Sequence, residues 1–147
     1  MRIQPIEPGT RSELADIEQQ IQAERGRISP LYQVLLHSPA IAKGWEGMLS
    51  AVRNYSSISP AIRELIILRV AMLNNAAYEF DAHVPHALKA GTSQEAIDAT
   101  RDVSVDVNAH WTPVEQLAIQ VTDALTRKVE VPEALFQRVA EHFNEQE

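Results

Sequence analysis

The sequence predicts an all-α protein, a single-domain bundle of about six helices that spans residues 1–147. Three observations lead to this prediction. Helix-start signals recur along the chain, and apolar residues spaced three or four apart follow them. A length of 147 residues is enough for one good hydrophobic core and short for two independent ones. No internal repeat or low-complexity segment interrupts the pattern.

Six helix starts are predicted at serine and threonine residues, whose side-chain oxygen can accept a hydrogen bond from the free N–H groups of a first helical turn. Three of them have capping-box spacing: Thr10 with Glu13, Thr92 with Glu95, and Thr112 with Glu115. At the other three a proline follows, where its missing N–H costs least: Ser29, Ser38 and Ser59.

The apolar residues after these starts indicate amphipathic helices, the first of which carries Leu14, Ile17 and Ile21. The stretch from 61 to 74 is apolar nearly all the way round and is predicted as the central helix, ended by Asn74 and Asn75. A last helix is expected to begin near Pro132.

Composition excludes several classes of function. The chain has 13 Lys and Arg against 20 Asp and Glu, a net charge of -7, and no basic cluster that would follow a phosphate backbone, so nucleic acid is not an expected partner. No apolar run reaches the roughly 18 residues of a membrane span, and no secretory signal is evident, which predicts a cytoplasmic location and no membrane partner. The absence of cysteine removes all thiol chemistry.

Candidate chemistry centres on Glu79, His83 and His86, which share one helix face because they are four and three residues apart. Glu64 on the preceding helix joins them if the two helices pack together across the short "NNAA" connection. A carboxylate bonded to one imidazole nitrogen fixes the tautomer and leaves the other nitrogen free for a substrate. The four groups can therefore serve general acid and base catalysis.

Simpler interpretations remain open. A histidine and a glutamate at this spacing are often a satisfied core pair or a solvated helix face. Pro85, between the two histidines, either kinks the helix or marks its boundary. The two imidazoles and the carboxylate are ligand types that zinc or iron accepts, but their spacing matches no established motif, and we expect neither a metal nor a cofactor.

The block from Ser59 to Ala96, "SPAIRELIILRVAMLNNAAYEFDAHVPHALKAGTSQEA", resembles the carboxymuconolactone decarboxylase family, which includes the alkylhydroperoxidase D-like proteins. The core of the resemblance extends over about residues 38–125. It implies an all-α bundle that assembles into homotrimers or homohexamers, with an active site on the central helices near a subunit interface.

The chain departs from this family in three places. In the peroxidase branch a C-x-x-C pair accompanies a glutamate and a histidine, and an alignment on Glu64 and His83 puts the two cysteine positions at Ala76 and Glu79. The decarboxylase branch needs no cysteine, and its glutamate and histidine resemble Glu79 and His83. Its arginine after the histidine is replaced here by Val84, Pro85 and His86. Similar proteins generally continue past Glu147 with a further apolar helix. If that helix is truly missing from this protein, its packing surface is expected to be covered by another subunit or left exposed.

These features lead to the hypothesis of a cofactor-independent, decarboxylase-like enzyme acting on a small carboxylated or lactone metabolite. His83 exchanges the proton, Glu79 orients it and Glu64 completes the relay. Substrate contacts are predicted from His86, Tyr78 and Arg63, with Arg69 as an alternative that can equally extend to the surface. A further hypothesis is proton-transfer or isomerase chemistry on another metabolite, which the same residues would serve. The alternative from another class is a non-catalytic oligomeric scaffold or small-ligand binding protein of the same fold.

Overall fold

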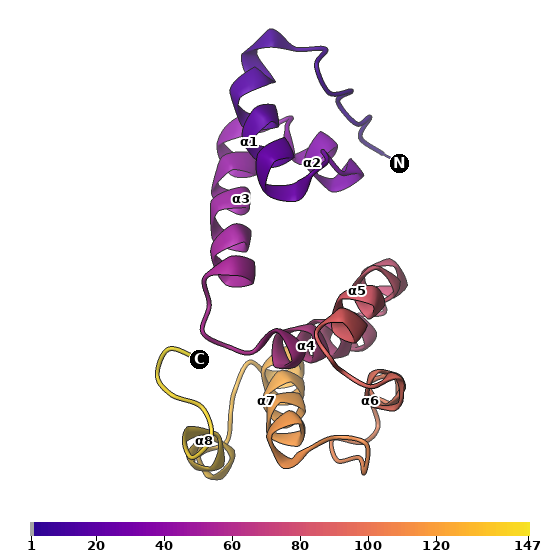
Figure 1. Cartoon of the computed structure of the whole chain (residues 1–147), viewed down its shortest axis with the longest axis vertical. Helices are drawn as coiled ribbons and strands as arrows, with labels where there is room; N and C mark the ends of the chain where they lie inside the picture. The colour runs from indigo at the N-terminus through magenta and orange to yellow at the C-terminus, as the bar shows by residue number, and fades with distance from the viewer. Residues whose placement is uncertain (1) are drawn as a thin grey trace. The chain divides into compact units, whose positions relative to one another are not determined.

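The computed structural model describes residues 2–147, and its regular secondary structure is entirely helical (Figure 1). Eight α-helices and one short 3₁₀ helix form, with no β-strand within residues 2–147. The all-α prediction is confirmed, and the helices are slightly more numerous than the six expected. The chain divides into two compact units, unit 1 (Met1–Ser56) and unit 2 (Ser57–Glu147).

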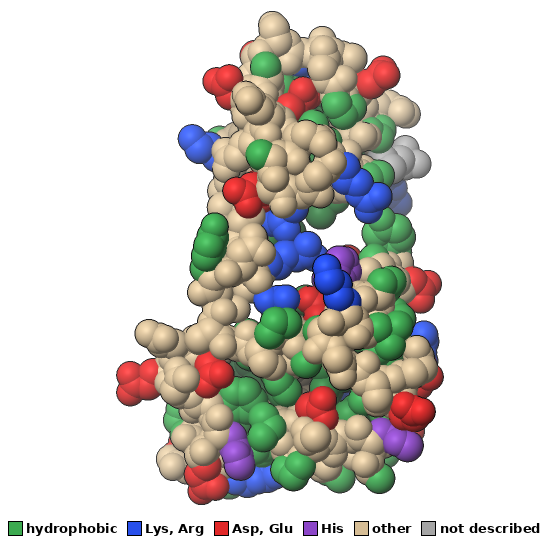
Figure 2. Space-filling model, viewed as in Figure 1, with side chains coloured by type: hydrophobic (Ala, Val, Ile, Leu, Met, Phe, Trp, Pro, Cys, Tyr) green, Lys and Arg blue, Asp and Glu red, His purple; other side chains and the backbone are tan. Residues whose placement is uncertain are grey.

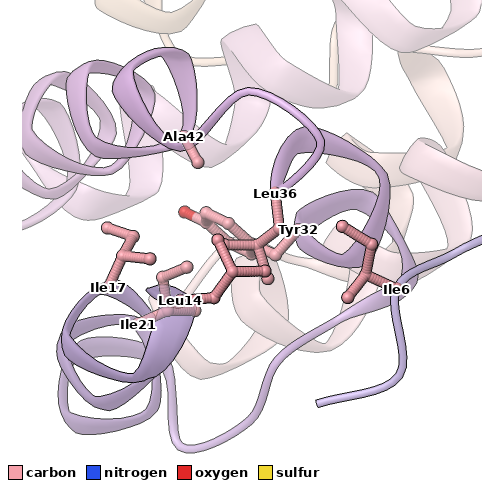
Figure 3. Close-up of a cluster of buried hydrophobic side chains, with 7 residues drawn as sticks. All are labelled: Ile6, Leu14, Ile17, Ile21, Tyr32, Leu36 and Ala42. Atoms are coloured by element: carbon pink, nitrogen blue, oxygen red, sulfur yellow. The ribbon is translucent and has the colours of Figure 1, made fainter. Parts of the chain in front are cut away.

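Unit 1 contains the 3₁₀ helix η1 (Ser12–Leu14) and three α-helices: α1 (Ala15–Arg25), α2 (Pro30–Leu35) and α3 (Pro39–Asn54). Both α1 and α2 pack against α3. Buried apolar side chains meet between these elements (Figure 3), namely Ile6, Leu14, Ile17, Ile21, Tyr32, Leu36 and Ala42. Complete burial of a leucine or isoleucine contributes about 1.5–3 kcal/mol, so this small core accounts for much of the stability of unit 1.

A polar cluster centred on Glu46 of α3 lies within unit 1. This carboxylate is completely buried. Arg25 Nε lies 3.0 Å from both of its oxygens, Ser50 donates to Oε1 at 2.6 Å, and the Tyr32 hydroxyl donates to Oε2. Burial alone would raise the pKa of Glu46, but the three hydrogen bonds and the charge of Arg25 outweigh it and hold that pKa below its usual value. The cluster thereby ties all three α-helices of unit 1 together.

Unit 2 is built around α4 (Pro60–Leu73), which packs against both α5 (Ala77–Lys89) and α7 (Pro113–Lys128). The short helix α6 (Gln94–Ala99) contacts α5, and α8 (Glu133–Ala140) contacts α7. The predictions of a central helix and of a last helix from about Pro132 are confirmed, since Pro132 is the N-cap of α8.

The observed helix caps agree in part with those predicted. Thr112 and Glu115 form the complete capping box of α7, and the Ser59 side chain caps α4. The predicted box at Thr92 is wrong by one residue, because Ser93 is the N-cap of α6 and its hydroxyl accepts from the N–H of Ala96. The predicted box at Thr10 does not form. The hydroxyl of Thr10 instead donates to the backbone carbonyl of Glu7.

Arg69 of α4 is completely buried and organises the segment between α6 and α7. Its guanidinium contacts both carboxylate oxygens of Asp123 on α7, at 2.6 and 2.7 Å. It also donates to three backbone carbonyls of the connecting segment, those of Thr100, Asp102 and Val105. Both expectations for Arg69, a substrate contact or a surface position, are therefore wrong. All three guanidinium nitrogens donate hydrogen bonds to acceptors inside the protein.

Two grooves lie on unit 2. One of about 610 Å³ lies between α4, α7 and α8 and is lined mostly by apolar side chains, including Ile66, Val70, Leu125 and Phe136. Hydrophobic side chains gather between α7 and α8 in Figure 2. The second, of about 810 Å³, has charged walls that include Asp106, Arg127 and Arg138. In the described part of the chain, no helix has the length and apolar character to cross a membrane.

Candidate active site

A tight turn places α5 beside α4. The last residue of α4 is Leu73, and Asn75 adopts the left-handed conformation with a φ of 56°. The N–H of Asn75 donates to the carbonyl of Met72 at 3.2 Å, and that of Ala76 to the carbonyl of Ala71 at 2.8 Å. This is the Schellman pattern of helix termination, in which asparagine can replace glycine. The prediction that Asn74 and Asn75 end the central helix is confirmed.

The turn brings Glu64 of α4 and His83 of α5 into direct contact. Nδ1 of His83 lies 2.7 Å from Oε2 of Glu64. Both residues are buried: Glu64 has 5% of its surface exposed and His83 has 4%. A carboxylate at this position accepts from Nδ1–H, which leaves the second ring nitrogen as the one that can exchange a proton. The predicted packing of Glu64 against the histidine helix is therefore observed.

Arg63 adds a positive charge beside this pair. Its Nε lies 3.4 Å from Oε1 of Glu64. Burial alone would raise the pKa of Glu64, but the hydrogen bond and charge of His83, together with the charge of Arg63, outweigh it and lower that pKa below its usual value. Glu64 is therefore ionised at neutral pH, the state in which it can orient an imidazole and stabilise a positive charge on it.

The second ring nitrogen of His83 faces Glu79. Nε2 lies 3.2 Å from Oε1 of Glu79, one helical turn earlier on α5. The Glu79 side chain is 53% exposed, whereas that of Glu64 is 7% exposed. The two carboxylates that flank the ring thus have different environments: the one at Nδ1 is buried and the one at Nε2 is partly exposed.

The remaining predicted residues lie on the exposed side of α5. The ring centroid of His86 is 5.5 Å from that of His83, with the ring planes inclined by 47°. His86 is exposed, and Tyr78 has 76% of its surface exposed. The structure therefore brings His86 next to the pair and places Tyr78 on the surface of the first turn of α5. Their roles toward a substrate stay predictions.

Pro85 lies inside α5, which continues to Lys89. The interpretation of Pro85 as a helix boundary is therefore wrong. A proline has no N–H for the carbonyl four residues earlier, that of Asp81. Both residues are exposed, so water can satisfy this carbonyl.

Sequence reasoning missed the apolar groove of unit 2. Its lining residues on α7, such as Leu125, have the spacing of an ordinary amphipathic helix, which by itself indicates packing against a core. The sequence signal for it is the apolar spacing of the predicted last helix, whose Phe136, Val139 and Phe143 line the groove. Neither of the two grooves is lined by Glu64, Glu79 or His83. Within residues 2–147, no three His, Asp or Glu side chains are grouped so that they could hold a metal ion.

The fold and the buried pair define a helical protein with a carboxylate and an imidazole on two neighbouring helices. Comparison with protein families matches residues 39–124 to the carboxymuconolactone decarboxylase family. This match covers more than half of the 147 residues, and the chain belongs to that family. The family prediction is confirmed, and Glu64, Glu79 and His83 all lie within the matched region.

Among curated proteins, the chain is similar to "Uncharacterized protein YdfG" of Bacillus subtilis (strain 168), with 31% identity over 94 residues. The aligned residues make up 63% of this chain and 63% of that protein, so the chain spans less than two thirds of the relative's length. No solved structure matches the chain.

Proposed function

We propose that this chain is a cofactor-independent enzyme that decarboxylates, or transfers a proton on, a small carboxylated or lactone metabolite. The observation that carries the proposal is the buried contact of 2.7 Å between Glu64 and His83, with the other ring nitrogen turned toward the half-exposed Glu79. Such a pair holds the imidazole in one orientation and leaves the other ring nitrogen beside a carboxylate that can exchange protons with solvent.

The sequence predicts that Glu79 orients His83 and that Glu64 completes the relay. In this proposal the two roles are reversed. Glu64 positions His83 through Nδ1, because it is the closer and more deeply buried carboxylate. Glu79 lies at Nε2, where it can pass a proton between the imidazole and water or substrate. A deeply buried carboxylate suits positioning, since it does not reorganise with solvent, and a half-exposed one suits proton exchange.

The chemical step is balanced without a cofactor. A substrate carboxylate leaves as carbon dioxide, and the electron pair of the broken carbon–carbon bond remains on the substrate as an enolate. The doubly protonated ring of His83, whose Nδ1–H stays bonded to Glu64, gives its Nε2 proton to that carbon and becomes neutral. The ring then regains a proton from water through Glu79. A positioned general acid of this kind contributes typically about 10²–10⁴-fold in rate. Without loss of carbon dioxide, the same proton exchange isomerises a carbonyl compound.

Binding of the substrate carboxylate is assigned in the proposal to His86 and Arg63, with Tyr78 at the rim. His86 is adjacent to His83 and exposed. Its position therefore suits contact with the carboxylate of a substrate that approaches the reactive nitrogen from solvent. Arg63 already contacts Glu64, and a substrate anion bound beside it would interact with the same guanidinium charge. Assembly into trimers or hexamers belongs to the same proposal and derives from the resemblance to the family. A cytoplasmic location also belongs to it and derives from the lack of an apolar run long enough to span a membrane.

The test is a panel of carboxylated lactones and β-keto acids incubated with the protein in D₂O. We expect saturable release of carbon dioxide from at least one of them, with deuterium on the carbon that lost the carboxylate. His83→Gln should lower this turnover by about 10²–10⁴-fold. His142→Gln, which changes an exposed histidine after α8, should retain it. If no compound turns over, or if His83→Gln is as active as the parent, the proposed chemistry is wrong.

A control separates this activity from that of thiol peroxidases of similar fold. The chain has no cysteine, so no thiolate is present to attack a hydroperoxide. Reduction of a hydroperoxide coupled to a dithiol should remain at the rate measured without protein.

The apolar groove of unit 2 favours a second candidate function, the binding of a small apolar ligand without chemistry. Its volume of about 610 Å³ and its mostly apolar lining are typical of small-molecule sites. Val121→Glu would place a charge in this groove and leave the Glu64–His83 pair intact. Loss of binding of an apolar fluorescent probe in this variant, combined with inactivity of the parent on the substrate panel, would favour this second function.

A further inference from the structure

The apolar groove of unit 2 has a buried floor and an exposed rim. Its floor includes Leu117 and Ala118 of α7, which have 3% and 6% of their surfaces exposed. Large apolar side chains from all three surrounding helices stay exposed at the rim: Val70 of α4 is 37% exposed, Leu125 of α7 47% and Phe136 of α8 55%. Exposed apolar side chains gathered around one groove are typical of a ligand site.

The charged residues of this groove all have the same sign. They are Glu145 and Glu147, which lie in the segment after α8, and none of the described residues that line the groove is Lys, Arg or His. A ligand with an anionic head group would therefore meet two negative charges in the groove and no positive one. A cationic head group would be attracted to the same two carboxylates.

The hydrogen-bond donors of the lining are mostly used within the protein. The Thr122 hydroxyl donates to the carbonyl of Ala118 at 2.7 Å. Asn144 donates from its backbone N–H and from its side-chain amide to Oε2 of Glu147, at 3.0 and 2.7 Å. A bound carboxylate or phosphate needs several donors, whereas the two carboxylates of the groove are acceptors only when ionised. The lining therefore suits a head group that brings positive charge or N–H groups.

These properties discriminate among the classes of apolar ligand. A plain hydrocarbon uses the floor and the rim of the groove but makes no use of its carboxylates. A fatty acid brings a third negative charge to them. An apolar amine or quaternary ammonium compound uses both parts of the lining, and the net charge of -7 favours its approach to the protein as a whole. The groove volume of about 610 Å³ lies within the usual range for small-molecule sites.

We propose that the apolar groove binds one dissolved cationic amphiphile, an amine or quaternary ammonium compound with an apolar body. The apolar body lies on α7 between α4 and α8, and the cationic head lies beside Glu145 and Glu147. This inference rests on the second candidate function given above and adds the chemical class of the ligand. It does not depend on the acid and base chemistry, because neither Glu64 nor His83 lines the groove.

Probes that share one octyl chain and differ in the head group test the proposal: octyltrimethylammonium, octanol and octanoate. Each is titrated into the full-length protein below its micelle concentration, and binding is followed by methyl NMR of Val121 and Leu125, which line the groove. We expect the ammonium compound to bind at least about tenfold more tightly than octanoate, with octanol between them. Equal dissociation constants would leave the apolar-ligand function standing and overturn the proposed head group. Binding of none of the probes would overturn both.

A double variant identifies the source of the preference. Glu145→Gln combined with Glu147→Gln removes both charges from the groove, and the ammonium and carboxylate probes should then differ by less than about threefold. Octanol binding should stay unchanged. The matched control combines Glu95→Gln with Glu130→Gln, which removes the same charge from exposed residues outside this groove and should keep the preference. A preference that survives in the groove variant, or that is lost equally in the control, contradicts the proposal.

Sedimentation of the same samples tests whether a second copy occupies the groove instead. We expect the ammonium probe to bind at protein concentrations where the sedimentation coefficient stays constant. An ammonium probe that leaves the NMR signals unchanged, while Val121→Glu dissociates an assembly of the parent chain, would assign the groove to a second copy and overturn the proposal.

Discussion

Nδ1 of His83 lies 2.7 Å from Oε2 of Glu64, although the two residues are 19 positions apart in the chain and on different helices. The contact exists because the left-handed Asn75 ends α4 and returns the chain along it. Both residues are buried, and Glu64 has a lowered pKa. An ionised carboxylate held against a histidine inside unit 2 is the feature on which the proposed acid and base chemistry depends.

The Glu64 carboxylate should make the stability of the protein sensitive to acid. Despite the opposing effect of burial, the hydrogen bond from His83 lowers the pKa of Glu64 below its ordinary value of 4.5. A carboxyl group of this kind stabilises the fold above that ordinary value, and the contribution is lost as the pH falls through the lower folded-state pKa. We expect Glu64→Gln to lower the free energy of unfolding by about 1–3 kcal/mol at neutral pH. Urea unfolding should show this difference shrinking below about pH 4.5.

The exposed Glu79 is the control for this measurement. Glu79→Gln removes the same charge from a side chain that is 53% exposed, and it should change the free energy of unfolding by less than about 1 kcal/mol. A Glu64→Gln difference that is independent of pH, or no larger than that of Glu79→Gln, would contradict the importance of the buried ion pair.

Arg69 and Asp123 should be strongly coupled in stability. Arg69→Met leaves a carboxylate and three backbone carbonyls without their donor, which should cost about 3–5 kcal/mol. The double variant with Asp123→Ala should lose less than the sum of the two single variants, by at least about 1 kcal/mol. Arg101→Met, at an exposed ion pair with Asp98, is the control and should cost less than about 1 kcal/mol. Additive losses would show that the buried pair does not act as one unit.

Tyr32 should ionise late in an alkaline titration. Burial, together with its hydrogen bond to Glu46, raises the pKa of Tyr32 from 10.0 to about 12. A group whose pKa is raised by folding stabilises the fold fully below its unfolded value, and this contribution is lost as the pH rises from 10.0 to about 12. Ultraviolet titration of the phenolates should therefore contain a step near pH 12 that is absent from Tyr32→Phe. The same late step in both proteins would show that Tyr32 is not its source.

Two threonines with the same sequence signature should respond differently to substitution by alanine. Thr112 forms a complete capping box with Glu115, so Thr112→Ala should lower the free energy of unfolding by about 1 kcal/mol. Thr10 caps no helix, and Thr10→Ala should change it by less than about 0.5 kcal/mol. Thermal unfolding of both variants provides the comparison, and equal losses would contradict the observed caps.

These threonines illustrate how much of the fold can be predicted from local sequence. The helical class, the central helix and its end at Asn74 and Asn75 depend on signals within a few residues, and all were predicted correctly. The caps at Thr10 and Thr92 were not. At Thr92 the preceding Gly91, with a φ of 95°, ends α5 and leaves the following Ser93 extended, so the cap shifts by one residue.

The candidate site shows the same limit at longer range. The spacing of Glu79 and His83 on one helix identified them as neighbours, and the short connection predicted that Glu64 approaches. Which carboxylate is buried against Nδ1 depends on how α5 is rotated against α4, a property that neither helix encodes alone. The partner of Arg69 could not be predicted for a related reason, since Asp123 lies 54 residues away on a helix whose orientation depends on the whole core of unit 2.

The most direct test of the central claim is nitrogen NMR of the His83 ring in the parent protein, in Glu64→Gln and in Glu79→Gln. If Glu64 positions the imidazole, the neutral ring in the parent carries its proton on Nδ1, and this single tautomer is lost in Glu64→Gln but kept in Glu79→Gln. A His83 ring that exchanges between both tautomers in the parent protein, or one that responds to Glu79→Gln and not to Glu64→Gln, would contradict the account.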